Sequence, residues 1–156
     1  MSEQSATVEE ILEQAIQFEV EAYEFYMGAV DMVKQSHIKD SMKDMAAEEV
    51  KHKERLQALL AGDTTTLIGV QARGQIQDLK LAEYLVAPTL GPDSTFQDVL
   101  VVAMQREKSS NEFYSTMASI AGDEDAKSLF EFLAQEELVH KNKVETLYDE
   151  VVYQDN

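Results

Sequence analysis

The chain contains Ala46-Ala-Glu-Glu-Val-Lys-His-Lys53 and, 88 residues later, the similar stretch Ala134-Gln-Glu-Glu-Leu-Val-His-Lys141. The same offset aligns residues 15–26 with residues 103–114, where Ala, Gln, Glu, Phe and Tyr recur in register. A single shift of 88 residues therefore aligns two segments of the first half of the chain with two segments of the second half. Such a repeat indicates duplication of a helical hairpin and predicts a bundle with approximate two-fold symmetry.

Residues that break regular structure are concentrated between the two halves. Both prolines and four of the six glycines lie within residues 62–92. The flanking segments are almost free of Gly and Pro, and their apolar residues recur at helical spacing. These patterns predict helices over 7–35, 37–61, 95–121 and 124–150.

The connector between the halves, residues 62–93, is too long for a tight turn. It is expected to run along the bundle, with a short helix around 78–86. Two antiparallel helical hairpins joined by one long crossover are the ferritin-like arrangement of a four-helix bundle. We therefore predict an all-α fold in which residues 1–156 form a single ferritin-like domain. At its start, Thr7 and Glu10 are spaced as a capping box.

Ionisable residues interrupt the apolar faces of the four predicted helices. Two of these helices carry a Glu and a His three residues apart, so that each pair projects from one helical face. The other two helices carry a single Glu at the equivalent place. We expect all six side chains to meet inside the bundle at about the same height: Glu19, Glu49, His52, Glu107, Glu137 and His140.

Four ionised carboxylates buried together would be very costly without compensation. Two divalent cations would balance their charge, and two neutral imidazoles would complete the coordination. Without metal, some of these acids should take up protons, because burial and like charges both raise the pKa of a carboxyl group. This ligand pattern is that of ferritin-like di-iron and di-manganese proteins. Oxygen and nitrogen ligands do not discriminate strongly between iron and manganese, so the sequence is compatible with either metal.

A single Glu-x-x-His pair on a glutamate-rich helix is usually a surface feature, so the metal interpretation depends on the repeat. Two of the three histidines occur in this motif, at the offset that also relates their partner glutamates. Glu48 and Glu136 fall one residue beside the apolar stripe. We interpret them either as surface residues or as residues that support the metal ligands.

Two tyrosines, Tyr26 and Tyr114, are the candidate catalytic residues outside the ligand set. They lie two helical turns after Glu19 and Glu107, on the same faces. Each could simply pack with its hydroxyl hydrogen-bonded inward. Each could instead donate to a ligand carboxylate or to a nearby oxidant.

The composition excludes several other classes of protein. The absence of Cys excludes a disulfide scaffold, a thiolate metal site and a cysteine nucleophile. Thirty acidic against 13 basic residues give a net charge of −17, which repels nucleic acid and anionic membranes. No apolar run approaches the ~20 residues of a membrane-spanning helix. The first residues lack a basic segment followed by an apolar one, so we expect a cytoplasmic protein.

The chain resembles the rubrerythrin branch of the ferritin-like superfamily over nearly its whole length. The resemblance rests on the six ionisable residues, the two tyrosines and the stretches 78–86 and 97–107. It implies a pair of irons in which two glutamates bridge and one Glu and one His complete each iron: Glu49 and Glu137 as bridges, Glu19 with His52, and Glu107 with His140.

Two departures from the rubrerythrin pattern affect the expected function. Rubrerythrins also carry a rubredoxin domain that relays electrons through four Cys, and this chain has none. Its electrons must therefore come from a separate donor protein. Rubrerythrins also carry an additional Glu one turn after the third-helix ligand, where this chain has Ser110. The remaining set of four Glu and two His is more similar to the symmetric site of bacterioferritin.

The resemblance implies first a di-iron oxidoreductase that reduces peroxide or dioxygen in an oxidative-stress role. The alternative is a ferroxidase or an iron-binding protein that handles iron. A metal-free acidic interaction module is the third hypothesis, and six interior polar residues disfavour it. We also expect a homodimer, in which the long crossover would allow helices to be exchanged between subunits.

Overall fold

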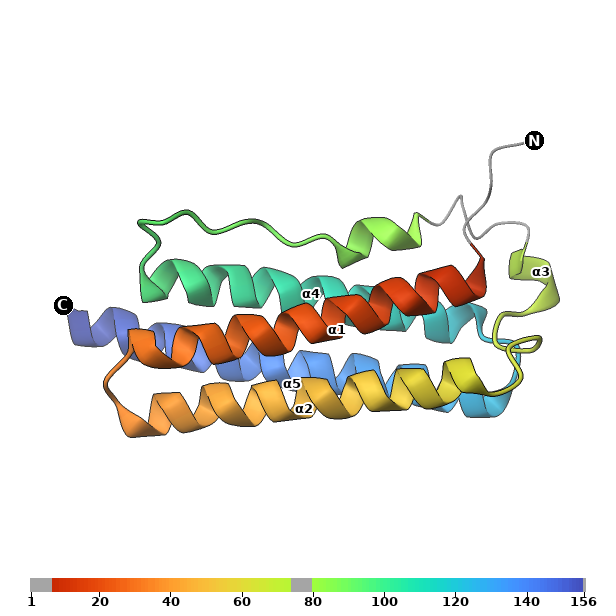
Figure 1. The fold of residues 1–156 in the computed structure, drawn as a ribbon, viewed down its shortest axis with the longest axis horizontal. Coiled ribbons are helices and arrows are strands. Elements are labelled where there is room, and N and C mark those ends of the chain that lie inside the picture. Colours follow the sequence, from red (N-terminus) through yellow and green to blue (C-terminus); the bar gives the residue numbers. More distant parts are fainter. Residues whose placement is uncertain (1–6, 74–79, 156) are drawn as a thin grey trace.

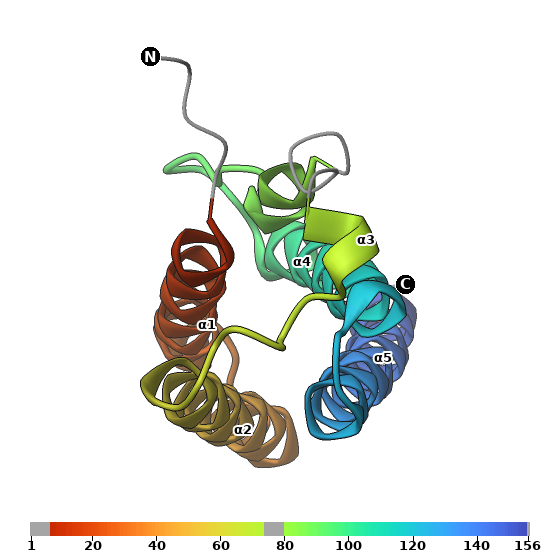
Figure 2. The same ribbon diagram turned by 90° about the vertical axis from the view of Figure 1, so that its right-hand side faces the viewer.

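Four long helices dominate the computed structural model, which describes residues 7–73 and 80–155 (Figure 1). They are α1 (Val8–Ala29), α2 (Ser36–Ala61), α4 (Phe96–Ile120) and α5 (Glu124–Asp155), accompanied by short α3 (Val70–Arg73) and two 3-10 helices, η1 (Val30–Met32) and η2 (Leu81–Leu85). Viewed from one end, the long helices occupy the four corners of the bundle in the order α1, α2, α5, α4 (Figure 2). The prediction of an all-α four-helix bundle is confirmed.

Local signals in the sequence set the helix ends. Thr7 and Glu10 form the predicted capping box, in which the Glu10 amide donates to the Thr7 hydroxyl at 3.1 Å and the Thr7 amide donates to the Glu10 carboxylate at 2.8 Å. Thr95 and Asp98 cap α4 in the same way. Each box pairs amides that the first helical turn leaves without a partner. The predicted end of the second helix is also correct, since α2 ends at Ala61 and Gly62 caps it.

The first helix is shorter than predicted, and the last is longer. The predicted helix 7–35 leaves the α-helical path after Ala29, continues as η1 and becomes extended at Val33. Val30 and Val33 are nevertheless buried, so the apolar spacing continues past the end of the α-helix. Hydrophobic periodicity alone could not locate this end. At the other terminus, α5 continues to Asp155, beyond the predicted end at 150.

The two helices of each hairpin pack along their length, α1 against α2 and α4 against α5, whereas helices of different hairpins make fewer close approaches. The connector leaves α2 at one end of the bundle, passes through α3 and returns along α1 and α4 to start α4 at the other end (Figure 1). In the short helix predicted around 78–86, Leu81–Leu85 form η2, which packs on α1 and α4. Residues 78 and 79 lie outside the described residues.

Most of the buried apolar residues form two clusters, one toward each end of the bundle. One cluster includes Leu12, Leu56 and Phe130, and the other includes Ile38 and Leu100. In every long helix, residues of one cluster precede the predicted site positions and residues of the other follow them. The candidate site is therefore a polar layer between two apolar layers.

A short backbone pairing ties the exit of the first hairpin to the turn of the second. The Gly122 amide donates to the Leu67 carbonyl at 3.0 Å, and the Gly69 amide donates to the Ile120 carbonyl at 2.7 Å. A Cβ atom on Gly122 would lie 2.3 Å from the Thr66 carbonyl oxygen. Only a residue without a side chain allows the two backbones to approach this closely.

Replacing Gly122 with alanine is expected to destabilise the protein by about 1–3 kcal/mol, because the backbone must move to relieve the clash. Gly28→Ala is the matched control, since its added Cβ would meet nothing within 4 Å. That helical substitution should stabilise the protein by up to about 1 kcal/mol. Urea denaturation of both variants measures the difference, and equal stabilities would contradict the role of Gly122.

Candidate metal centre

Six ionisable side chains form the polar layer in the middle of the bundle. α1 and α4 each contribute one Glu, while α2 and α5 each contribute a Glu and a His from adjacent turns. All six are at most 2% exposed. The structure brings together the complete set expected from the sequence: Glu19, Glu49, His52, Glu107, Glu137 and His140.

The potential ligand atoms of these residues form two overlapping groups. Within each group the atoms all lie within 4.8 Å of one another. The groups are Glu19, Glu49, His52 and Glu137, and then Glu49, Glu107, Glu137 and His140. Glu49 and Glu137 belong to both groups and lie between the two histidines. The duplicated hairpin thus produces two four-residue sites that share two carboxylates.

Many of the polar atoms in this layer have no hydrogen-bond partner. Within the described ranges, one carboxylate oxygen of each of the four glutamates and Nδ1 of each of the two histidines are buried without a partner. Leaving buried polar atoms unpaired is costly, so such a concentration needs an explanation. Carboxylate oxygens and imidazole nitrogens are donors that suit iron and manganese. The residues present therefore fit a pair of divalent cations.

The two imidazoles lie close to the shared carboxylates. His52 Nδ1 is 3.1 Å from Glu49 Oε1 and 3.2 Å from Glu137 Oε1. His140 Nδ1 is 3.5 Å from Glu49 Oε1 and 3.6 Å from Glu107 Oε1. The two rings are stacked, with centroids 5.8 Å apart. Both histidines thus direct Nδ1 toward the same cluster of carboxylate oxygens.

Protons are held tightly in this layer when no cation neutralises it. Burial, followed by repulsion from the other glutamates, raises the pKa of Glu49 well above its usual range and that of Glu137 to about 7. Burial alone would lower the pKa of His140, but the nearby Glu107 and the other surrounding carboxylates raise the pKa to about 9. The pKa of His52 is also raised, because the effect of three neighbouring glutamates exceeds that of burial. This is the proton uptake expected of a metal-free site.

Both candidate tyrosines contact the site, and each crosses to the other hairpin. The Tyr26 hydroxyl on α1 donates to Glu107 Oε1 on α4 at 2.6 Å. The Tyr114 hydroxyl on α4 donates to Glu19 Oε2 on α1 at 2.6 Å. Of the roles considered from the sequence, the structure shows donation to a site carboxylate. The sequence pattern did not indicate which carboxylate each tyrosine would reach.

Two further glutamates lie on the solvent side of the histidines. Glu48 Oε1 is 2.7 Å from His140 Nε2, and Glu136 Oε1 is 3.6 Å from His52 Nε2. Both are only partly buried. The sequence left their role open between the surface and support of the ligands, and the structure places both beside the site histidines.

Sequence reasoning missed Arg106, a buried cation next to the site. Its guanidinium lies 4.3 Å above the centre of the Phe18 ring and donates to the Phe18 carbonyl at 3.2 Å. Arg106 precedes Glu107 in α4, and Phe18 precedes Glu19 in α1. The two residues are thus equivalent under the repeat and contact each other across the bundle. The sequence did contain a signal for this contact, because the repeat places an Arg before one predicted ligand and a Phe before the equivalent ligand.

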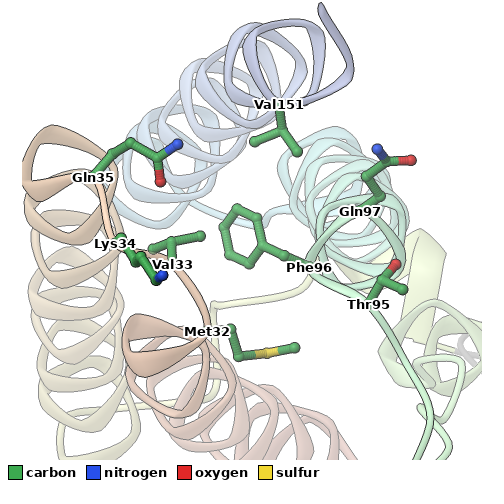
Figure 3. A pocket seen from close by; sticks show the side chains of 8 residues that line it. All are labelled: Met32, Val33, Lys34, Gln35, Thr95, Phe96, Gln97 and Val151. Carbon is green, nitrogen blue, oxygen red and sulfur yellow. The ribbon is translucent and has the colours of Figure 1, made fainter. Parts of the chain in front are cut away.

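A surface hollow of about 420 Å³ lies at one end of the bundle, away from this layer. It is formed where the turn between α1 and α2 meets the start of α4 and the end of α5. Phe96 projects into it between Val33 and Val151 (Figure 3). None of the six residues of the polar layer lines this hollow, so it is not part of the candidate centre.

Comparison with known proteins identifies the family to which the chain belongs. The family model described as Rubrerythrin matches residues 10–148, which include all six residues of the polar layer and both tyrosines. The chain belongs to the rubrerythrin family. The resemblance found in the sequence is thereby confirmed. No curated protein matches the chain.

Two solved structures support the fold of this rubrerythrin family member. A hypothetical protein from Pyrococcus furiosus superposes with a TM-score of 0.69 at 24% identity, over 95% of this chain and 92% of that one. A candidate ferritin-like diiron-carboxylate protein from Thermotoga maritima superposes with a TM-score of 0.71 at 19% identity, over 96% of this chain and 99% of that one. The predicted ferritin-like arrangement is thus confirmed. In the described ranges, no helix has both the length and the apolar content needed to cross a bilayer.

Stability of the metal-free protein is expected to fall as the pH rises from 6.5 to about 9, the interval between the ordinary and the folded pKa of His140. The folded state holds this proton more tightly than the unfolded chain does. Its contribution to the free energy of unfolding is therefore complete below the ordinary pKa and is lost as the pH rises through the folded value. The raised pKa of Glu137 has the same effect, and its contribution to the free energy of unfolding is lost as the pH rises to about 7.

Urea denaturation of chelator-treated protein across this interval measures the effect. The control is protein saturated with a divalent metal, whose stability should fall less, because metal binding displaces the same protons. A constant or rising free energy of unfolding in the chelated protein would contradict the assignment.

Proposed function

We propose that this member of the rubrerythrin family holds two iron ions in the polar layer and reduces peroxide or dioxygen. The observation that carries the proposal is the pair of four-residue groups that share Glu49 and Glu137 and contain buried polar atoms without a hydrogen-bond partner. Buried polar atoms without partners destabilise a helical bundle, so packing alone does not explain this arrangement. Two cations would satisfy these atoms and balance the charge of four glutamates.

Each iron would have its own Glu and His and would share the two remaining carboxylates. The two sets would be Glu19 with His52 and Glu107 with His140, with Glu49 and Glu137 common to both. When bound, iron supplies redox chemistry: two electrons that, with two protons, reduce one hydrogen peroxide to two waters. Manganese would meet the same donors.

The chain's own residues would position the ligands and exclude water. The two apolar clusters cover the polar layer from both ends of the bundle. Tyr26 and Tyr114 would fix the orientation of Glu107 and Glu19 through their hydrogen bonds. The 156 residues contain no Cys, and the electrons would come from a separate donor protein.

Iron oxidation and handling is the second candidate function. The observation that favours it is the two-fold equivalence of the ligand groups, with Ser110 buried where rubrerythrins have an additional Glu. Four Glu and two His then form a symmetric set. Such a site would oxidise ferrous iron and release it, rather than turn over peroxide.

Glu49→Ala and Glu137→Ala are each expected to abolish tight binding of both metals, because each removes a ligand shared by the two groups. His52→Ala should chiefly weaken one metal, since His52 belongs to a single group. Metal analysis of the purified variants measures the occupancy. Glu54→Ala, at an exposed position of α2, is the matched control and should retain two metals. Full occupancy in all the variants would exclude the shared-ligand assignment.

Stopped-flow mixing of the diferrous protein, first with peroxide and then with oxygenated buffer, separates the two candidate functions. The expected result is rapid consumption of peroxide that continues when a reductant is supplied. Glu137→Ala should lack this activity. Iron uptake well beyond two ions per chain, with slow peroxide consumption, would instead support iron handling. Metal-free protein that gains no stability from ferrous iron would refute both functions.

A further inference from the structure

The outer faces of the two site histidines are not equivalent, although the sequence around them is repeated. Glu48 on α2 faces the ring of His140 on α5, and Glu136 on α5 faces the ring of His52 on α2. The first contact is 2.7 Å long, which is a hydrogen bond, while the second is 3.6 Å, which is too long for one. The two glutamates are similarly accessible, with 36% and 29% of their side chains exposed.

The hydrogen bond to Glu48 determines which nitrogen of His140 faces the centre with a lone pair. A carboxylate can only accept, so the Nε2–H of His140 donates to Glu48. In the neutral ring the lone pair is then on Nδ1, which lies 3.5–3.7 Å from oxygens of Glu49, Glu107 and Glu137. His140 is thus held in the tautomer and orientation that a metal ligand requires.

His52 lacks this support. Both of its ring nitrogens are buried without a hydrogen-bond partner in the part of the chain that the structure describes. Its Nδ1 also approaches the shared carboxylates, at 3.1 and 3.2 Å from Glu49 and Glu137. Nothing on the outer side fixes the tautomer, so binding of a cation would have to select the tautomer and hold the ring in place.

We propose that Glu48 is a positioning residue that makes the two halves of the centre unequal. The half formed by Glu107 and His140 is preorganised and takes the first cation more tightly, while the half formed by Glu19 and His52 takes the second more weakly. This inference rests on the proposed function only in requiring that the centre binds two cations. A carboxylate behind a ligating histidine typically contributes 10–100-fold to metal affinity.

Two unequal binding steps are not sufficient to establish this inference, because two neighbouring cations repel each other even in a symmetric site. A loss of surface charge near the centre would also weaken cation binding in general. The repeat supplies the control for both effects. Glu48 and Glu136 carry the same charge at equivalent places, and only Glu48 makes the hydrogen bond.

The experiment is anaerobic calorimetric titration of metal-free protein with Fe(II), repeated with Co(II), on the wild type, Glu48→Ala, Glu136→Ala and Glu48→Gln. Glu48→Ala should weaken the tighter step by about 10–100-fold. Glu136→Ala should change that step by less than about fivefold, the scale of one exposed charge. Glu48→Gln should recover most of the affinity, because the amide oxygen still accepts from Nε2–H. A role of Glu48 through charge alone would not be rescued in this way.

The outcomes separate this inference from the proposed function. If the wild type binds two cations but Glu48→Ala and Glu136→Ala have equal effects, the halves are equivalent and the inference is wrong. It is equally wrong if Glu48→Ala weakens only the looser step. If the wild type binds no cation, the proposed function fails and the inference fails with it. Thermal unfolding of each metal-free variant shows whether the fold is retained, which is expected because both glutamates are partly exposed.

Discussion

The bundle must accommodate four carboxylates that repel one another in a layer from which water is excluded. Each of these glutamates is at most 2% exposed, so solvent cannot screen their charges. The surrounding residues reduce the cost in three ways: two imidazoles lie among the carboxylates, two tyrosines donate to the outer ones, and protons are retained at pH values where exposed acids have lost them. Cations would satisfy the same atoms more completely, which is why we assign the layer to metal binding.

The bundle accommodates this layer through its division into hairpins. Helices pack closely within each hairpin and less closely between hairpins, so the polar side chains meet in the space between the hairpins. The apolar clusters on either side supply the burial that stabilises the fold. A tyrosine from each cluster then reaches a glutamate of the opposite hairpin. The side chains that pack the core therefore also hold the site in place.

The internal repeat accounts for the symmetry of the centre, and the differences between its two copies account for the asymmetry. The two shared glutamates and the two histidines are equivalent under the repeat, as are the two tyrosines. Arg106 and Phe18 occupy equivalent positions but differ completely in chemistry, and they contact each other beside the site. The contacts behind the histidines also differ in length. A member of the rubrerythrin family built from two similar halves can thus have different surroundings at its two groups of potential ligands.

The helices, the crossover topology and the six residues of the polar layer could all be predicted from the amino-acid sequence. These features depend on local spacing and on one exact repeat offset, both of which are visible in a single chain. Helix periodicity could not locate the end of α1, because Val30 and Val33 stay buried after the α-helix ends. The sequence could not show which tyrosine reaches which glutamate, or which histidine gains a hydrogen bond on its outer side. Those contacts depend on how the two hairpins are placed against each other, to within fractions of an ångström, and sequence spacing along one helix carries no information about that placement.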